Sequence, residues 1–488
     1  MGSSTVELRQ GVYRDSVTLM QISRTVSECA GVTAALIAMA TPLNLDLLPR
    51  LGFDPVEDCR PDDLLVAIEA DDDGALAAAL ARLDELFAVR ETSSGSVDEV
   101  PSHTSRSALA RTRGNLVVVS LPGQSALVES MDALAAGADV MLFSDNVSVE
   151  QEVRLKEEAH RRGLLVMGPD CGTAIVGGVG LCFANVMRPG KVGVVAASGT
   201  GAQQVCALLD AAGIGVSAVL GTGGRDLSQA VGARSSLDAM AMLDQHDGTE
   251  LVVMLSKPPP ADVAAKVEAA AAGLKTPSVV GFLGRGRDDL TAVTAKVVAA
   301  LGEPPLQVPE WTAPLPHNFR GGAVRGLYSG GTLCDEAMVV AQASLGPIAS
   351  NIPLEKEWAL PESLTAPGHL MIDFGDDKLT QGRPHPMIDW TLRMERFDVE
   401  VADPTCGVLL LDVVLGYGSH MDPAGVLVPH VQSATEHGVA VVVSLIGTSG
   451  DPQGLEKTAL ALQSAGASVY LSNAAAARVA AGLVKESV

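Results

Sequence analysis

The chain has 488 residues and a formal net charge of −24, and 47% of its residues are hydrophobic but only 3% aromatic. A chain this acidic has little positive charge to place against nucleic-acid phosphates or an acidic membrane surface, so we expect no nucleic-acid or membrane partner. No apolar run reaches the roughly 20 residues of a membrane span and the first ten residues lack a signal-peptide pattern, which predicts a cytoplasmic protein.

The seven cysteines are scattered along the chain. They form no CxxC pair, and no histidine stands at ligand spacing from any of them. A disulfide framework and a metal site are therefore not expected.

The first 107 residues predict a small α/β module. Residues 15–31 have apolar positions at helical spacing, 32–41 and 62–70 read as strands, and 74–90 read as a helix with one apolar face. A short βαβ unit is implied, and a Ser-rich linker over 91–107 closes it.

Residues 108–190 alternate regularly between strand and helix patterns, which is typical of a Rossmann-like parallel sheet covered by helices. The loops Ser120–Gly123, Ser144–Asn146 and Gly168–Cys171 each follow a strand, so we expect them at one carboxyl edge, where ligands bind in this architecture. No GxGxxG follows the first strand, so a dinucleotide redox site is not expected.

The ranges 191–303 and 323–488 repeat one pattern and predict two flavodoxin-like domains, joined by a Pro-rich linker over 304–322. Each begins with a buried strand, a Ser-Gly turn and a helix, and such a turn points backbone N–H groups at an anion. The alternative is that the turns are ordinary helix N-caps. The residues predicted to bind phosphate are Ser198, Gly199, Thr200, Gly201, Ser329, Gly330, Gly331 and Thr332.

The segment Gly382–Asp389 presents Arg383 and His385, each followed by proline, on a stiff extended loop. Such a loop suits recognition of a carboxylate or phosphate and proton transfer, so both residues are predicted to be catalytic. The alternative is a rigid structural loop in which His385 caps a neighbouring helix.

Two further loops supply candidate substrate-binding residues. Arg225 can contact an anion or form a surface salt bridge. Cys171 has no evident histidine partner, which favours a packing role over a nucleophile. The residues predicted to bind substrate are Gly223, Gly224, Arg225, Asp170 and Cys171.

The motif Gly168–Thr173, followed by a Gly-rich hairpin and the turn at Ser198, resembles the junction between the CoA-binding and ligase domains of the succinyl-CoA synthetase α subunit. More specifically, the chain resembles the FdrA family of acyl-CoA-synthetase-like proteins in residues 144–173, 220–228, 256–259 and 375–389. The resemblance implies a CoA-binding-type domain over 108–190 and two succinyl-CoA-ligase-like domains over 191–303 and 323–488.

The FdrA family is linked to oxamate carbamoyltransferase in allantoin breakdown, which converts oxalurate and phosphate to oxamate and carbamoyl phosphate. The resemblance therefore implies companion subunits, an oligomer and a small anionic substrate. Where the synthetases carry a phosphorylated histidine this chain has Gly284–Thr291 without histidine, so covalent phosphoryl transfer through that position is excluded. Phosphate would then be held non-covalently.

Two alternatives stay open. An acyl-CoA synthetase-like enzyme would use CoA and a magnesium nucleotide, but the ATP-grasp portion of the synthetases has no counterpart in this sequence. A regulatory subunit without catalysis would use the anion site as a sensor. No cofactor is certain from the sequence.

Overall fold

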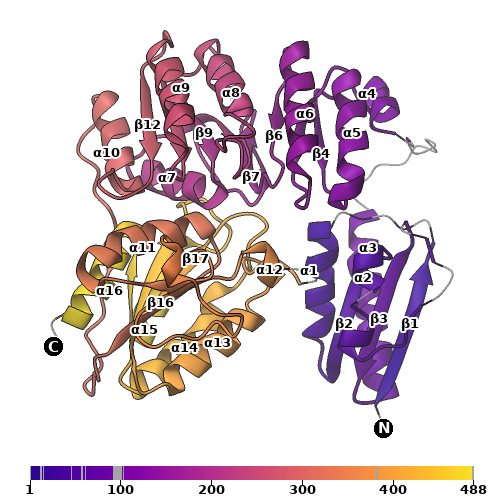
Figure 1. Ribbon diagram of the computed structural model, residues 1–488. Coiled ribbons are helices and arrows are strands. Elements are labelled where there is room, and N and C mark those ends of the chain that lie inside the picture. The colour runs from indigo at the N-terminus through magenta and orange to yellow at the C-terminus, as the bar shows by residue number, and fades with distance from the viewer. Residues whose placement is uncertain are drawn as a thin grey trace.

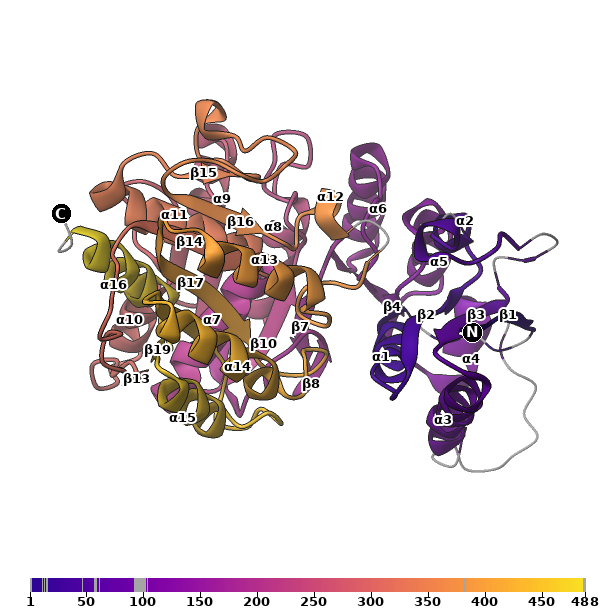
Figure 2. The same ribbon diagram turned by 90° about the horizontal axis from the view of Figure 1, so that it is seen from below.

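The computed structural model describes residues 2–10, 12, 14, 16–45, 47–56, 59–60, 62–91, 102, 104–380 and 383–485. These residues form four α/β units, each built on its own sheet and grouped around a common centre (Figure 1). Seen from below, the N-terminal module lies to one side of the two large C-terminal units (Figure 2). The α/β fold class predicted from the sequence is confirmed.

The N-terminal module, residues 2–91, has a three-stranded sheet in the order β1-β3-β2. Both pairings are antiparallel, so the parallel βαβ unit expected from the sequence is wrong, and the first strand was not foreseen. The central strand β3 is almost entirely buried because it has a neighbour on each side. The elements are β1 (Ser3–Arg9), α1 (Ser16–Ser27), β2 (Val32–Met39), α2 (Pro42–Leu45), a 3-10 turn (Pro49–Leu51), β3 (Leu64–Ala70) and α3 (Asp73–Glu91).

The CoA-binding-type unit, residues 104–167, is a parallel sheet in the order β4-β5-β6. Its helix α6 starts with a capping box between Ser148 and Gln151 and stops at Gly163, whose left-handed backbone ends the helix. The predicted linker overlaps α4, and its residues 92–101 and 103 lie outside the described residues. The elements are α4 (Ser105–Thr112), β4 (Leu116–Val119), α5 (Gly123–Ala135), β5 (Asp139–Leu142), α6 (Val149–Arg162) and β6 (Val166–Met167).

The first ligase-like unit, residues 173–302, has a six-stranded sheet in the order β12-β11-β9-β10-β7-β8. Strands β9 to β12 are parallel, whereas β7 and β8 form a hairpin that joins β10 antiparallel. The range 108–190 predicted from the sequence therefore contains strands of two sheets. The elements are β7 (Thr173–Val176), β8 (Val179–Cys182), β9 (Pro189–Ala197), α7 (Gly199–Ala211), β10 (Val216–Gly221), α8 (Arg234–Asp244), β11 (Leu251–Ser256), α9 (Ala261–Ala272), β12 (Ser278–Phe282) and α10 (Leu290–Ala300).

The second ligase-like unit, residues 310–485, has a seven-stranded sheet in the order β13-β19-β18-β17-β14-β16-β15. The Pro-rich stretch predicted as a linker contributes its edge strand β13, which pairs antiparallel with β19. The elements are β13 (Glu310–Trp311), β14 (Ala323–Tyr328), α11 (Gly331–Leu345), β15 (Ala349–Ser350), a 3-10 turn (Lys356–Trp358), β16 (Leu370–Asp373), α12 (Asp377–Thr380), α13 (Thr391–Ala402), β17 (Cys406–Val414), α14 (Pro423–Glu436), β18 (Ala440–Ile446), α15 (Leu455–Ala465), β19 (Ala467–Tyr470) and α16 (Asn473–Lys485).

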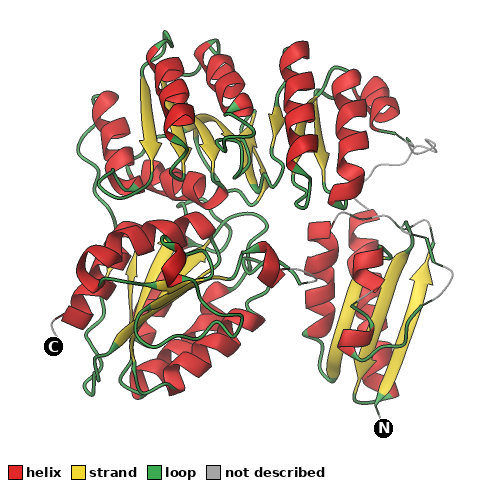
Figure 3. Ribbon diagram, viewed as in Figure 1, coloured by secondary structure: helices red, strands yellow, loops and turns green. Residues whose placement is uncertain are grey.

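One continuous hydrophobic core joins the two ligase-like units. Helices α7 and α10 of the first unit pack with α11 and α16 of the second, and their apolar side chains belong to one buried cluster. Figure 3 shows these helices as a layer between the two sheets. Because each helix starts at the carboxyl end of a strand, this packing directs the starts of α7 and α11 toward one another.

Candidate functional site

The two predicted Ser-Gly turns meet at the boundary between the ligase-like units. Ser198 caps α7, where its hydroxyl oxygen accepts a hydrogen bond from Gly201 N at 2.9 Å. The same hydroxyl donates to Thr332 Oγ1, in the first turn of α11, at 2.7 Å. Two helix N-termini from different units are therefore held at one point, as the repeat in the sequence predicts.

The contact between the turns depends on glycine at position 330. A Cβ atom on Gly330 would lie 2.6 Å from Thr200 Cγ2 and 2.7 Å from Thr200 Oγ1. Protein atoms do not approach this closely without a bond. Any larger residue would therefore push the two helix starts apart.

The prediction that all eight turn residues offer donors to a ligand is corrected at Ser329 and Gly330. The N–H groups of both residues donate to the carboxylate of Asp412, at 2.8 and 2.9 Å, and the Ser329 hydroxyl donates to it as well. Arg393 forms a buried ion pair with the same carboxylate at 2.8 Å. The Asp412 carboxylate thus already accepts hydrogen bonds from the two N–H groups that were predicted to bind a ligand.

Four other backbone donors remain. Among the described residues, none accepts a hydrogen bond from the N–H groups of Gly199, Thr200, Gly331 and Thr332. Gln203 lies one helical turn after Thr200 and is 1% exposed, and neither of its amide atoms has a hydrogen-bond partner in the described part of the chain. Buried amides are normally paired, so the amide of Gln203 has hydrogen-bonding capacity that the described residues leave unused.

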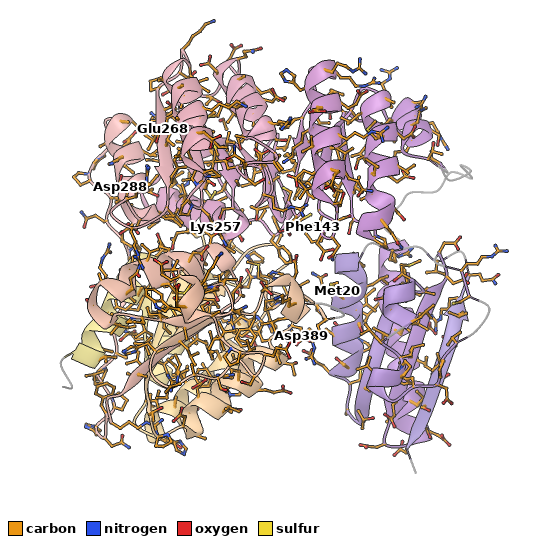
Figure 4. The ribbon with its side chains drawn as sticks, viewed as in Figure 1. Met20, Phe143, Lys257, Glu268, Asp288 and Asp389 are labelled. Atoms are coloured by element: carbon orange, nitrogen blue, oxygen red, sulfur yellow. The ribbon has the colours of Figure 1, made fainter. Side chains whose placement is uncertain are left out.

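Lys257 brings a positive charge to the same place. It follows β11 directly, and its Nζ atom forms an ion pair with Asp335 of α11 at 2.7 Å. A Cβ atom on Gly331 would lie 3.4 Å from Lys257 Nζ and 2.6 Å from Asp373 Oδ2. Figure 4 shows Lys257 at the junction of the two ligase-like units. Desolvation lowers the pKa of Lys257, but the attraction of Asp335 and Asp373 outweighs it, so the amine stays charged.

Asp373 ends strand β16 and is 5% exposed. Its Oδ1 atom accepts a hydrogen bond from Gly375 N at 2.9 Å, and none of the hydrogen bonds among the described residues ends on Oδ2. Burial raises the pKa of the Asp373 carboxyl to about 7; Lys257 opposes this rise, and Asp412 and Asp335 add to it. Near neutral pH this carboxyl therefore exists both with and without its proton.

His385 lies beside Asp373. A Cβ atom on Gly375 would stand 3.1 Å from Asp373 Oδ1 and 3.2 Å from His385 Nε2, so the two side chains meet over this glycine. Burial and the charge of Arg393 lower the pKa of His385 to about 4. Its Nδ1 atom accepts a hydrogen bond from Met387 N at 3.2 Å, which assigns the ring proton to Nε2. His385 is thus a neutral N–H donor.

Arg383 differs from His385 in its surroundings. Its side chain is exposed, and its backbone N–H donates to Thr380 O at 2.9 Å. Gly382, the first residue of the predicted loop, lies outside the described residues. The stiff loop therefore places one of the two predicted catalytic residues at a partly buried position and the other at an exposed one.

The Gly223–Arg225 loop packs against the CoA-binding-type unit. A Cβ atom on Gly223 would lie 2.3 Å from Pro169 O, so only glycine fits there. Gly224 has no such neighbour. Arg225 donates to Val147 O at 2.7 Å and pairs with Glu152 at 3.1 Å, which matches the salt bridge considered as the alternative.

Below this loop, Lys156 forms fully buried ion pairs with Glu152 and Asp226, each at 2.8 Å. It also donates to Thr222 O at 2.9 Å. These bonds tie helix α6 to the loop after β10. The loop therefore holds its shape through charges that sequence reasoning did not single out.

Asp170 and Cys171 have opposite environments. The carboxyl of Asp170 reaches solvent, yet desolvation and the charges of Asp377 and Asp145 raise its pKa to about 7. Cys171 is 2% exposed, and burial raises the pKa of its thiol to about 12. The thiol stays protonated, which supports the packing role favoured by the sequence.

Within the part of the chain that the structure describes, no group of three or more His, Cys, Asp and Glu side chains is arranged to hold a metal ion. In the same residues, no helix is long and apolar enough to cross a membrane.

Three observations define the class of protein: the paired helix N-termini, the repeated ligase-like units and the CoA-binding-type unit before them. Residues 327–483 match the CoA-ligase family, and residues 1–102 match a domain described as "AllF, heavy metal-associated domain". The chain is 37% identical to the uncharacterized protein YahF of Escherichia coli K12 over 95% of both chains. The chain belongs to the FdrA family, within the wider group of CoA-ligase-like proteins.

More distant relatives are CoA ligase subunits. The chain is 30% identical to the malate–CoA ligase subunit alpha of Methylorubrum extorquens, over 26% of this chain and 44% of that protein. It is 26% identical to a succinate–CoA ligase subunit alpha of Archaeoglobus fulgidus, over 32% of this chain and 53% of that protein. The chain thus spans about half the length of these subunits.

A solved acetyl-coenzyme A synthetase of Candidatus Korarchaeum cryptofilum aligns with 80% of this chain and 89% of its own, at 17% identity and a TM-score of 0.30. A score this low supports no argument about function. The name of the N-terminal family refers to heavy metals, but the described residues hold no metal-binding cluster, so we derive no metal chemistry from it.

Sequence reasoning missed Asp373, Asp412 and Arg393 and included Lys257 within the segment 256–259 that carries the family resemblance. Two of these carried a usable signal, because Lys257 and Asp373 stand at the carboxyl ends of buried strands, where ligands meet a parallel sheet. Asp412 is a lone charge inside a nine-residue apolar strand. Such a residue requires a buried partner, but the sequence alone does not name Arg393 as that partner.

Proposed function

We propose that this chain is a subunit of a transferase that moves a carbamoyl or acyl group between phosphate and a small nitrogen-containing acceptor. The specific reaction proposed is that of oxamate carbamoyltransferase, in which oxalurate and phosphate give oxamate and carbamoyl phosphate, with companion subunits. The observation that supports it is the convergence of the N–H groups of Gly199, Thr200, Gly331 and Thr332 beside Lys257. Such groups stabilise the oxygens of phosphate and of a transferring phosphate ester.

The residues also fit chemistry without a covalent phosphoenzyme. The segment Gly284–Thr291 has no histidine, and the partly buried His385 is neutral with its Nδ1 lone pair already engaged. A phosphate held only by donors and by Lys257 keeps an oxygen free to attack a carbamoyl carbon. Holding both reactants in one place then supplies much of the acceleration.

A CoA-dependent ligase is the alternative, favoured by the match of residues 327–483 to the CoA-ligase family. The residues of the CoA-binding-type unit do not fit CoA well. A Cβ atom on Gly123, at the start of α5, would lie 2.4 Å from Asp145 O and 2.5 Å from Asn146 O. Asp145 and Asp170 add negative charge at this edge, which repels the phosphates of CoA.

The test is a thermal-shift titration of the purified chain with phosphate, carbamoyl phosphate, CoA and magnesium ATP in parallel. A ligand that binds only the folded state raises the melting temperature. Stabilisation by phosphate and carbamoyl phosphate, followed by phosphate-dependent cleavage of oxalurate in the complete complex, would support the transferase. Stabilisation by CoA, or an acid-labile phosphoprotein formed from magnesium ATP, would favour the ligase.

A further inference from the structure

We propose that Asp373 is the proton donor of this site: it takes up a proton when an anion binds at the two helix starts and passes that proton to the leaving nitrogen. The inference rests on the proposed function, because it concerns the same site. Four structural observations support it, and each concerns the carboxyl group of this one residue.

The first observation is position. Asp373 Oδ2 lies against the first residue of α11, 2.6 Å from where a Cβ atom of Gly331 would stand. A group bonded to the N–H groups of Gly331 and Thr332 is therefore within reach of this oxygen. The second observation is that Oδ1 accepts the hydrogen bond from Gly375 N, whereas none of the hydrogen bonds among the described residues ends on Oδ2. One oxygen orients the group, and the other can carry a proton.

The third observation is the backbone around Asp373. Its N–H donates to Asn351 Oδ1 at 2.9 Å, and Asn351 Nδ2 donates to Asp373 O at 2.8 Å. This pair of bonds fixes the backbone at the end of β16, and the bond from Gly375 N to Oδ1 orients the carboxyl itself. A fixed position is what a proton-transfer group requires.

The fourth observation is the set of charges facing Asp373. Lys257 faces it from the end of β11, Asp335 from α11 and Asp412 from β17, and neutral His385 lies beside it. Because Arg393 pairs with Asp412, two cations stand among three carboxylates, which leaves a negative surplus of one charge. An incoming phosphate adds to that surplus, so binding and protonation of Asp373 favour one another.

The chemical step balances without a further reactant. An oxygen of the phosphate monoanion or dianion forms a bond to the carbamoyl carbon, and the bond from that carbon to the amide nitrogen breaks. The nitrogen takes the electron pair of the broken bond and the proton of Asp373. The attacking phosphate, which loses its own hydroxyl proton, returns one to the carboxylate. Oxidation states do not change.

The test uses the intact chain and inorganic phosphate as probe. Isothermal titration calorimetry at pH 7.5 in two buffers of different ionisation enthalpy measures the protons taken up on binding. We expect net uptake by the wild type, and binding without uptake by Asp373→Asn. Glu336→Gln is the matched control, because Glu336 is also buried with its pKa raised by burial to about 7 but bonds only Leu290 N and Asn473 across the helix layer. This control should keep the uptake.

The outcomes separate the two proposals. Wild-type binding with no difference in proton uptake between wild type and Asp373→Asn would overturn the role of Asp373 and leave the anion site standing. No phosphate binding by the wild type would overturn the proposed anion site, and the proton donor with it.

If Asp373→Asn does not fold, a second variant tests the same proposal. Removing the cation by Lys257→Met raises the affinity of Asp373 for its proton, so the pH range in which phosphate binding takes up a proton should shift upward. An unchanged pH dependence of the proton uptake would contradict the proposal. In the active complex, Asp373→Asn should lower kcat by about 10²–10⁴-fold and remove the basic limb of the pH profile. A merely structural role would lower stability without changing that profile.

Discussion

The hydroxyl group of Ser198 donates to the hydroxyl group of Thr332 across 2.7 Å and so joins the first turns of two helices from different units, 134 residues apart. The same Ser198 oxygen also caps α7, so one hydroxyl group both links the two units and completes the first turn of a helix. The geometry of the proposed phosphate site therefore depends on a single side chain at the boundary of two units.

Replacing Ser198 by alanine should lower the free energy of unfolding by about 0.5–2 kcal/mol, the usual cost of losing a helix cap. It should also weaken phosphate binding, because the starts of α7 and α11 are no longer tied. Ser148→Ala is the matched control, since Ser148 caps α6 in the same way. Urea unfolding and calorimetry should reveal equal losses of stability but weaker phosphate binding only for Ser198→Ala.

Gly330→Ala should destabilise the chain by about 1–3 kcal/mol, because the new methyl group would overlap Thr200 and force the helix starts apart. Gly482→Ala, in α16, adds a methyl group with no neighbour within 4 Å, and alanine favours a helix. Its unfolding midpoint should stay the same or rise. Equal midpoints for the two variants would argue against the close contact described here.

Arg393→Met should cost about 3–5 kcal/mol, because it leaves the carboxylate of Asp412 buried without its cation. Arg161→Met removes an arginine whose pair with Glu158 is largely exposed, so its unfolding curve should overlay that of the wild type. Chemical denaturation at pH 7 compares the two. A wild-type curve for Arg393→Met would mean that Asp412 has another partner.

Glu336→Gln should change how stability depends on pH. Burial raises the pKa of Glu336 from 4.5 to about 7, so the folded chain holds this proton more tightly than the unfolded chain. The stabilisation is present in full below pH 4.5 and is lost as the pH rises to about 7. Melting temperatures across this window should fall less steeply for the variant. Parallel curves would contradict the assignment.

Arg24→Ala should release the N-terminal module. The Arg24 guanidinium donates to Ile388 O and contacts the ring of His420, both in the second ligase-like unit. Figure 4 shows Met20 of α1 and Asp389 facing each other at the same junction. We expect a larger radius of gyration by small-angle X-ray scattering. Arg82→Ala, at an exposed position of α3 where the arginine pairs with Glu85, should leave it unchanged.

Much of the fold was predictable because the repeat is local in sequence. A strand, a Ser-Gly turn and a helix recur at Ser198 and Ser329, and the structure has both elements in both places. The N-terminal sheet was not predictable in the same way. Strand β1 pairs with β3, 55 to 67 residues away, and short-range patterns carry no information on such a pairing.

The site was predictable in its location but not in its charges. The helix starts were expected to bind an external anion, yet Ser329 and Gly330 bind Asp412 instead. Which carboxylates stay inside and which face a ligand depends on how β14, β16 and β17 lie side by side. That order exists only after the chain has folded, so the sequence does not say which of Asp373 and Asp412 accepts the N–H groups of the Ser329 turn.

The core shared by α7, α10, α11 and α16 has a consequence for how this protein can be divided. If the chain were cut between residues 304 and 309, before β13, each half would expose the apolar face that now covers the other. Neither fragment should be soluble when made alone, whereas the two made together should assemble without the peptide bond. Each ligase-like unit thus supplies part of the apolar surface that the other needs in order to fold.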